Sequence, residues 1–151
     1  MYERFCFLYK KRKNGSIMVF TVYGDPKGKG RPRFTKTGIA YTPKDTKQYE
    51  DNVRAAYLSS EEKESFSGPV CAKIVGFFKI PKNISKKKRE LMIGTPYIHK
   101  CDADNLAKII LDSLNGFAYK DDSCVTSLKV IKIYGDEPKV VVSLTKEEQI
   151  V

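Results

Sequence analysis

Hydrophobic residues alternate with turn-forming residues along this chain in a pattern that predicts both strands and helices. Four runs are rich in β-branched and aromatic residues and predict strands, over residues 17–23, 70–80, 125–134 and 139–144. Pro81 ends the second run, because proline has no amide hydrogen with which to continue a sheet. Residues 135–138 form a turn signal between the last two runs, so we expect those two strands to pair as a β-hairpin.

Two other segments, residues 44–59 and 105–114, carry apolar residues at helical spacing and predict helices. A short basic helix is predicted between them, over residues 85–91. Ser85 is the expected N-cap of the second helix, since its hydroxyl can accept a hydrogen bond from an unpaired amide. Asn115-Gly116 supplies the C-terminal stop of the third helix. The apolar face of that helix consists of Leu106, Ile110, Leu111 and Leu114. Residues 24–43 lack such a pattern and predict a long loop rich in glycine, proline and basic residues.

The length of 151 residues fits one compact domain with its own core. No apolar run is long enough to span a membrane, and the apolar start of the chain lacks a small-residue cleavage site, so we expect a cytosolic protein. The four cysteines are scattered without a Cys-x-x-Cys pair, and His99 is the single histidine. Neither a zinc site nor a disulfide framework is indicated, and we interpret the cysteines as reduced packing residues.

Positive charge is concentrated in two segments of the chain. The formal net charge is +10, and residues 24–47 and 79–100 each carry seven Lys or Arg residues with few acids between them. Residues 101–122 carry a net negative charge, with five Asp residues and only two basic residues, Lys108 and Lys120. Clustered positive charge of this kind favours binding to a phosphate backbone. An ordinary solvated basic surface is the alternative for any single charged run.

The acidic segment predicts a metal-dependent nuclease site. Asp102 and Asp104 are two residues apart, and in an extended segment both carboxylates would point to the same side, about 7 Å apart. Mg²⁺ prefers oxygen ligands and takes one or two carboxylates together with water and substrate phosphate oxygens. Asp121 or Asp122 would complete the site if the turn after the helix returns to the start of the helix. Lys108, one helical turn after Asp104, could hold the scissile phosphate or stabilise the transition state.

These residues also have purely structural interpretations. Asp102 or Asp104 could cap the helix that follows, since Asp is a favoured N-cap, although capping does not prevent metal ligation. Lys108 could simply pair with Asp104 or Asp112 along the helix. Asp121-Asp122 could form an ordinary turn.

Three ring-bearing residues near the charged segments leave two interpretations open. His99 lies beside the acids and could act as a general base, but a single loop histidine is more often incidental. Phe34 and Tyr41 lie within the basic loop, where they either stack on nucleic-acid bases or pack beneath the loop.

Five short segments follow one another along the chain in a fixed order: Gly-Lys-Gly-Arg-Pro-Arg-Phe at 28–34, Tyr-Thr-Pro at 41–43, Ile-Ser-Lys-Lys-Lys-Arg at 84–89, Asp-x-Asp-Asn-Leu-x-Lys-x-x-x-Asp-x-Leu-Asn-Gly at 102–116, and Tyr-Lys-Asp-Asp-Ser at 119–123. In this order they resemble the RusA family of Holliday junction resolvases over about residues 18–145. The acidic block is specific to this family, whereas each basic segment alone is weak evidence for the resemblance. The resemblance implies a single α+β domain in which helices pack on a mixed β-sheet.

The resemblance also implies an activity and a set of site residues. RusA-family members are small homodimeric endonucleases that depend on Mg²⁺, with Mn²⁺ as an expected substitute, and many are encoded by prophages. They cut branched DNA, the four-way junction, by paired symmetric nicks in recombination and repair. Carried over by position, Asp102, Asp104 and Asp122 are metal ligands, with Asp121 as the alternative third ligand, and Lys108 is the catalytic lysine. The residues expected to bind DNA are Lys27, Lys29, Arg31, Arg33, Lys86, Lys87, Lys88 and Arg89.

The chain differs from the family pattern at its start. Members typically begin with a short strand just before the glycine-rich loop, and a start of this kind corresponds to Met18 here. We therefore interpret residues 1–17 as an N-terminal extension or a misassigned start, residues 18–145 as the nuclease domain and residues 146–151 as a polar tail. Two non-enzymatic alternatives stay open. One is a basic nucleic-acid-binding module without catalysis, and the other is a ribosome-associated protein whose charge neutralises RNA.

Overall fold

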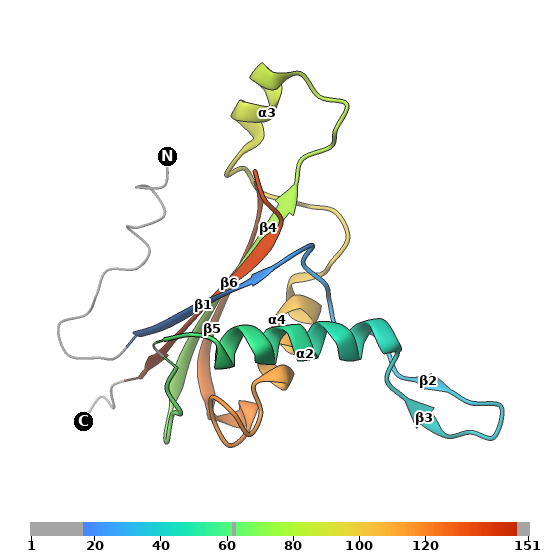
Figure 1. Cartoon of the computed structure of the whole chain (residues 1–151), viewed down its shortest axis with the longest axis vertical. Helices are drawn as coiled ribbons and strands as arrows, with labels where there is room; N and C mark the ends of the chain where they lie inside the picture. The colour runs from blue at the N-terminus through green and yellow to red at the C-terminus, as the bar shows by residue number, and fades with distance from the viewer. Residues whose placement is uncertain (1–16, 62, 148–151) are drawn as a thin grey trace.

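A computed structural model describes residues 17–61 and 63–147 and shows one mixed four-stranded sheet with helices packed on it. Its long strands are β1 (Ile17–Tyr23), β4 (Val70–Lys79), β5 (Val125–Gly135) and β6 (Lys139–Lys146). Its helices are α2 (Lys44–Leu58), α3 (Lys86–Met92), α4 (Ala103–Ser113) and the 3-10 turn η2 (Asp122–Cys124). The α+β class expected from the resemblance is therefore confirmed (Figure 1).

The sheet order is β1-β6-β4-β5, with β1 and β4 antiparallel to β6, and β5 parallel to β4. The predicted hairpin between β5 and β6 is therefore wrong, because β4 lies between these two strands. The turn at residues 135–138 does join them along the chain, but β4 is buried along most of its length and takes the central position. A local turn signal could not reveal that a distant, more apolar strand would enter between its two arms.

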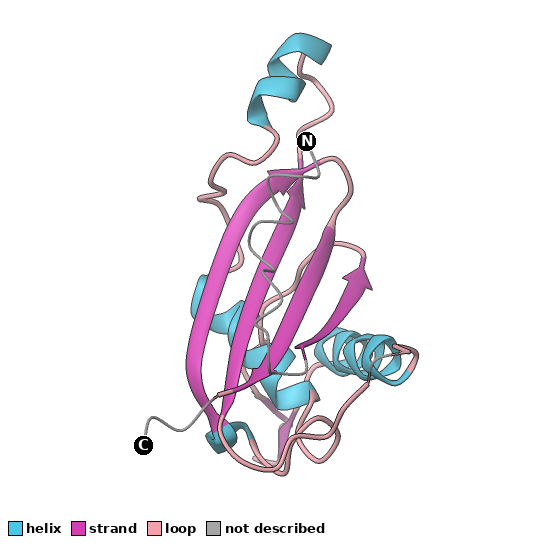
Figure 2. Ribbon diagram, turned by 90° about the vertical axis from the view of Figure 1, so that its left-hand side faces the viewer, coloured by secondary structure: helices cyan, strands magenta, loops and turns pink. Residues whose placement is uncertain are grey.

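The core lies between the sheet and the pair of helices α2 and α4. Figure 2 shows α4 passing behind the sheet, with α2 seen nearly end-on beside the sheet at the lower right. The strands contribute Phe20, Ile74, Val142 and Leu144, and the helices contribute Val53, Tyr57, Leu106 and Ile110. Gly76 of β4 makes room for Leu106 of α4, because a Cβ placed on Gly76 would lie 3.0 Å from a Leu106 methyl carbon. This close approach fixes α4 on the centre of the sheet.

The predicted helices are confirmed with small shifts at their ends. The Ser85 side chain accepts a hydrogen bond from the Lys88 amide, as expected of the N-cap of α3. Helix α4 begins at Ala103, two residues before the predicted start, so Asp104 is helical instead of extended. The predicted long loop over residues 24–43 carries a short hairpin of its own, β2 (Arg33–Phe34) paired with β3 (Ala40–Tyr41).

Two elements extend beyond the sheet and its packed helices. Helix α3 lies past the ends of the strands, and the β2–β3 hairpin extends past the N-terminal end of α2 (Figure 1). No residue of α3 is buried. Of the interpretations made for the chain ends, the N-terminal extension up to Ser16 and residues 148–151 of the tail lie outside the described residues. No helix in the described part of the chain is long and apolar enough to cross a membrane.

Replacing Leu106 by alanine tests the packing of α4 on the sheet. The Leu106 side chain is fully buried against Gly76, so Leu106→Ala is expected to lower the free energy of unfolding by about 3 kcal/mol in urea denaturation. Leu91→Ala is the matched control, because Leu91 is 73% exposed on α3 and its loss is expected to change the free energy by less than about 0.5 kcal/mol. Equal effects of the two changes would contradict this view of the core.

Candidate active site

The start of α4 carries two carboxylates that have no partner among the described residues. Asp102 occupies the N-cap position with an extended backbone, but its side chain makes no capping hydrogen bond. Asp104 follows in the first turn, where a negative charge is favoured by the helix dipole. Both residues are exposed, and within residues 17–61 and 63–147 neither carboxylate forms a hydrogen bond or ion pair. The capping alternative is thus correct for the backbone of Asp102 and wrong for its carboxylate.

Lys108 lies one helical turn beyond Asp104 and is exposed. The alternative in which Lys108 only pairs with Asp104 or Asp112 is not observed, since Asp112 is paired with Lys29 instead. The Lys108 ammonium is therefore available to a phosphate approaching the exposed side of α4.

The loop before Asp102 is fixed by hydrogen bonds to residues of β5. Its backbone runs along the end of that strand, where the Tyr97 amide donates to the Lys132 carbonyl at 3.0 Å. The Lys132 ammonium in turn donates to the carbonyls of His99, at 3.3 Å, and Cys101, at 2.7 Å. Cys101 has a φ of 85°, a left-handed conformation that is rare outside glycine and therefore strained. Lys132 thus stabilises a strained residue directly before the first candidate ligand.

Aromatic rings surround this lysine. The rings of Tyr97 and Phe78 stack with centroids 3.9 Å apart, and Tyr97 also meets the rings of His99 and Tyr134 edge-on. The Lys132 ammonium lies 5.5 Å from the Tyr97 ring centroid, within the range of a cation–π interaction. His99 is exposed, and its ring takes part in this packing.

The second acidic pair meets α4 at its other end. The Asp121 side chain accepts a hydrogen bond from the Ser123 amide at 2.8 Å, and this hydrogen bond lowers the pKa of Asp121. Asp122 turns toward Asp112, and partial burial together with the nearby Asp121 and Asp112 carboxylates raises the pKa of Asp122. The turn after α4 therefore brings Asp122 to Asp112, and the metal role predicted for Asp122 with Asp102 and Asp104 stays a prediction.

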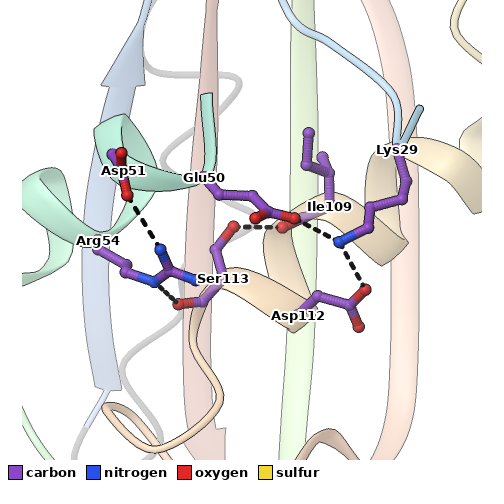
Figure 3. Close-up of polar contacts among 7 residues, drawn as sticks. All are labelled: Lys29, Glu50, Asp51, Arg54, Ile109, Asp112 and Ser113. Carbon is purple, nitrogen blue, oxygen red and sulfur yellow. Dashed lines mark hydrogen bonds and ion pairs between the residues drawn. The ribbon is translucent and has the colours of Figure 1, made fainter. Parts of the chain in front are cut away.

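A half-buried lysine, Lys29, connects the glycine-rich loop to both core helices (Figure 3). The Lys29 ammonium lies between Glu50 of α2, to which it is hydrogen-bonded, and Asp112 of α4, with 3.2 Å from Nζ to the Asp112 carboxylate oxygen. Burial alone would lower the pKa of Lys29, but the hydrogen bonds to Glu50 and Asp112 outweigh burial and raise it. The three groups therefore form one partly buried ionic network.

The backbone of the same loop follows α4 closely. The Lys29 amide donates to the Asn105 carbonyl at 2.9 Å, and a Cβ on Gly28 would lie 2.9 Å from the Cβ of Asn105. Only glycine permits so close an approach between the loop and the helix. Figure 3 also shows Arg54 of α2, whose Nε donates to the Ser113 carbonyl at the end of α4 at 3.0 Å. The two helices are therefore joined at several polar contacts.

The predicted DNA-binding residues divide into exposed and inward-facing groups. Lys27, Arg31 and Arg33 are exposed in the loop, as are Lys86, Lys87 and Lys88 on α3. Arg89 is half-buried and donates to the Pro81 carbonyl at 3.3 Å. Lys29 is the exception in the loop, because its charge is already neutralised by two carboxylates. Its DNA-binding role stays untested, and its contacts give it a structural one.

The donor chemistry at the start of α4 fits a hard divalent cation. In the part of the chain that the structure describes, no hydrogen bond or ion pair occupies the carboxylate oxygens of Asp102 and Asp104. Among the described residues, no three His, Cys, Asp or Glu side chains converge as a complete metal site. Mg²⁺ does not need such a site, because water and substrate phosphate oxygens fill most of its octahedral positions. Two carboxylates are therefore a sufficient protein contribution.

Comparison with known proteins identifies the family. The family model described as "Endodeoxyribonuclease RusA" matches residues 23–145. The chain belongs to the RusA family of endodeoxyribonucleases. A Bacillus subtilis strain 168 protein described as "Uncharacterized protein YqaN" is 36% identical over 135 residues, which cover 83% of this chain and 93% of that relative. In this RusA-family chain the acidic segment and the basic segments both lie within the matched region.

Sequence reasoning missed the roles of Glu50 and Lys132. Glu50 offered a signal, since it is a charged residue next to Tyr49 on the buried face of a helix that also presents Val53 and Tyr57. A buried carboxylate needs a cation, and the nearby basic loop could supply one. Lys132 gave no such signal, because its contacts join residues more than thirty positions apart.

Lys29→Met tests the ionic network. Removing the ammonium leaves Glu50 and Asp112 partly buried without a counterion, so the free energy of unfolding is expected to fall by about 2 kcal/mol in urea denaturation. The control Lys27→Met removes an exposed lysine from the same loop and is expected to change the free energy by less than about 0.5 kcal/mol. The double variant Lys29→Met with Glu50→Gln is expected to recover part of the loss. A single Lys29 variant as stable as the Lys27 variant would refute the network.

Proposed function

We propose that this protein is a Mg²⁺-dependent endonuclease that resolves four-way DNA junctions by paired, symmetric nicks as a homodimer. The observation that carries the proposal is the pair of exposed carboxylates Asp102 and Asp104 at the start of α4, followed by Lys108, none of which has a partner among the described residues. These residues are set within a strongly basic protein of the RusA family. Mn²⁺ is the expected substitute for Mg²⁺.

The candidate residues on and beside α4 have separate roles at the phosphate. Asp102 and Asp104 would hold the cation, with Asp122 as the proposed third carboxylate and Asp121 as its alternative. The bound Mg²⁺ would supply an activated water and neutralise charge on the phosphate under attack. Lys108 binds the scissile phosphate and stabilises negative charge that develops during the displacement. Lys132 and the packing around Tyr97 keep the loop before Asp102 in place.

The exposed cations of the loop and of α3 bind the DNA arms. The β2–β3 hairpin of the loop and helix α3 extend to separate places on the molecule, beyond α2 and beyond the strand ends (Figure 1), so one protomer can contact the DNA backbone at two places. A four-way junction has approximate twofold symmetry, and two active sites related by a twofold axis would give paired cuts. This is the physical reason for proposing a homodimer, which light scattering coupled to size-exclusion chromatography measures directly.

Asp102→Asn is expected to abolish cleavage without abolishing binding. The amide removes the negative charge that holds the cation while it keeps the shape of the side chain, so cleavage of a labelled four-way junction in Mg²⁺ should fall at least about a hundredfold. Junction affinity in EDTA should be unchanged or slightly higher, because an acid facing the phosphates is gone. Both quantities are measured by gel electrophoresis.

Asp136→Asn is the matched control, since Asp136 is an exposed aspartate in the turn between β5 and β6. It makes the same chemical change far along the chain from α4 and should leave cleavage unchanged. Binding without cleavage by the wild-type protein, in Mg²⁺ and in Mn²⁺, would instead support the non-catalytic binding module. Equal loss of cleavage in the Asp102→Asn and Asp136→Asn variants would contradict the proposal that Asp102 has a specific role in cleavage.

Lys132→Met tests the positioning of Asp102. Without the two carbonyl contacts the strained loop can relax and displace Asp102, so cleavage at saturating junction is expected to slow about tenfold while junction affinity holds. Lys132→Arg keeps the charge and the donors and should restore most of the rate. A rate unaffected by Lys132→Met, or a loss seen only in affinity, would argue against a positioning role.

A further inference from the structure

The β2–β3 hairpin exposes large apolar side chains that contribute nothing to the core. Phe34 is 69% exposed, Ile39 is 65% exposed and Tyr41 is 45% exposed. The alternative in which Phe34 packs beneath the basic loop is therefore wrong. Exposed apolar side chains gathered on one small element are a sign of an interaction surface.

The hairpin is nevertheless well ordered by its own hydrogen bonds. The Thr35 amide donates to the Ile39 carbonyl and the Gly38 amide donates to the Thr35 carbonyl, each at 2.9 Å. The Ile39 amide also donates to the Thr35 hydroxyl at 3.0 Å, and Gly38 has the φ of +82° that a tight turn requires. The apolar side chains are thus presented on a defined tip, and the folding of the tip does not depend on burying them.

Strand pairing gives the hairpin two different faces. Arg33 lies opposite Tyr41, and Phe34 lies opposite Ala40, and residues directly opposite each other in a strand pair share a face. One face therefore combines a guanidinium with an aromatic ring, and the other is apolar. All residues from 31 to 40 are exposed, and within the described residues Arg31, Arg33 and Lys36 form no ion pair.

The charge of the hairpin selects its partner. No acid occurs between Asp25 and Asp45, so the exposed rings and aliphatic groups are accompanied only by cations. A protein partner of mixed charge would not need this bias, whereas nucleic acid offers both phosphates for the cations and base faces for the rings. Paired bases inside a duplex are covered by their neighbours, but bases at a branch point or in a single strand have exposed faces.

We propose that the β2–β3 hairpin binds unstacked DNA bases, with Phe34 stacking on a base and Arg33 and Tyr41 holding the adjoining strand. The proposal rests on the proposed function for its location at the branch point of a junction. The hairpin extends past α2, so its tip can reach DNA that the cations of the loop already hold (Figure 1). It would make the protein prefer branched over continuous duplex DNA.

Phe34→Ala tests the hairpin by binding alone. With four-way junction, duplex and single-stranded oligonucleotides in EDTA, the variant is expected to bind junction and single strand about tenfold more weakly than the wild type, with less than a twofold change for duplex. Arg33→Ala should weaken binding to all three DNAs, because a phosphate contact is not selective. Leu91→Ala, which removes a 73% exposed leucine from α3, should change none of them. Circular dichroism is expected to be unchanged, because Phe34 is outside the core.

Equal binding of Phe34→Ala and wild type to both junction and single strand would overturn the hairpin proposal and leave the proposed nuclease function standing. A wild-type protein with no preference for junction over duplex would instead count against the proposed function, and the single-strand comparison then decides the hairpin proposal alone. Loss of dimer formation in Phe34→Ala, measured by light scattering, would assign the hairpin to a protein contact and also overturn the proposal.

Discussion

The position of one ammonium group, that of Lys29, holds together the parts of this protein that meet around α4. Glu50 and Asp112 come from different helices, and each carboxylate is partly buried, so without a cation between them both would be desolvated and mutually repulsive. The lysine that neutralises them belongs to a loop whose backbone also binds Asn105. One charge thus links α2, α4 and the loop that leads to the β2–β3 hairpin.

The charges of the protein separate according to whether they are engaged in the fold. Asp112, Glu50, Asp51 and Asp25 form ion pairs with lysines or arginines. Asp102 and Asp104 remain unengaged within the described residues, as does Lys108 between the two ends of the helix. Leaving charges without partners costs little at an exposed position, where water solvates them. Such charges are free to bind a metal ion or a phosphate without first breaking a contact.

Local signals in the sequence predicted most of the elements, because their causes are local. The cap at Ser85, the apolar face around Leu106 and the stop at Gly116 each depend on neighbours within a few residues. Contacts between residues far apart in the chain were not predictable in this way. Insertion of β4 between β5 and β6, the inward turn of Lys29 and the contacts of Lys132 all join residues far apart in the chain. The residues of the candidate site were predicted from the sequence, but the geometry of the site depends on these long-range contacts.

The parallel pairing of β4 and β5 determines where the two acidic clusters lie relative to the sheet. Parallel neighbours require a crossover, and here the crossover carries α4 across the sheet, with Asp102 where the helix begins and Asp122 where the chain returns to β5. Asp104 and Asp112 are eight residues apart on one helix, hence about 12 Å apart along its axis, which is too far for one cation to bind both. Lys108 lies midway, one turn from each. A phosphate bound by Lys108 in the proposed site would therefore have carboxylates on both sides, with Asp122 as the member of the second cluster proposed to join Asp102 and Asp104 on the cation.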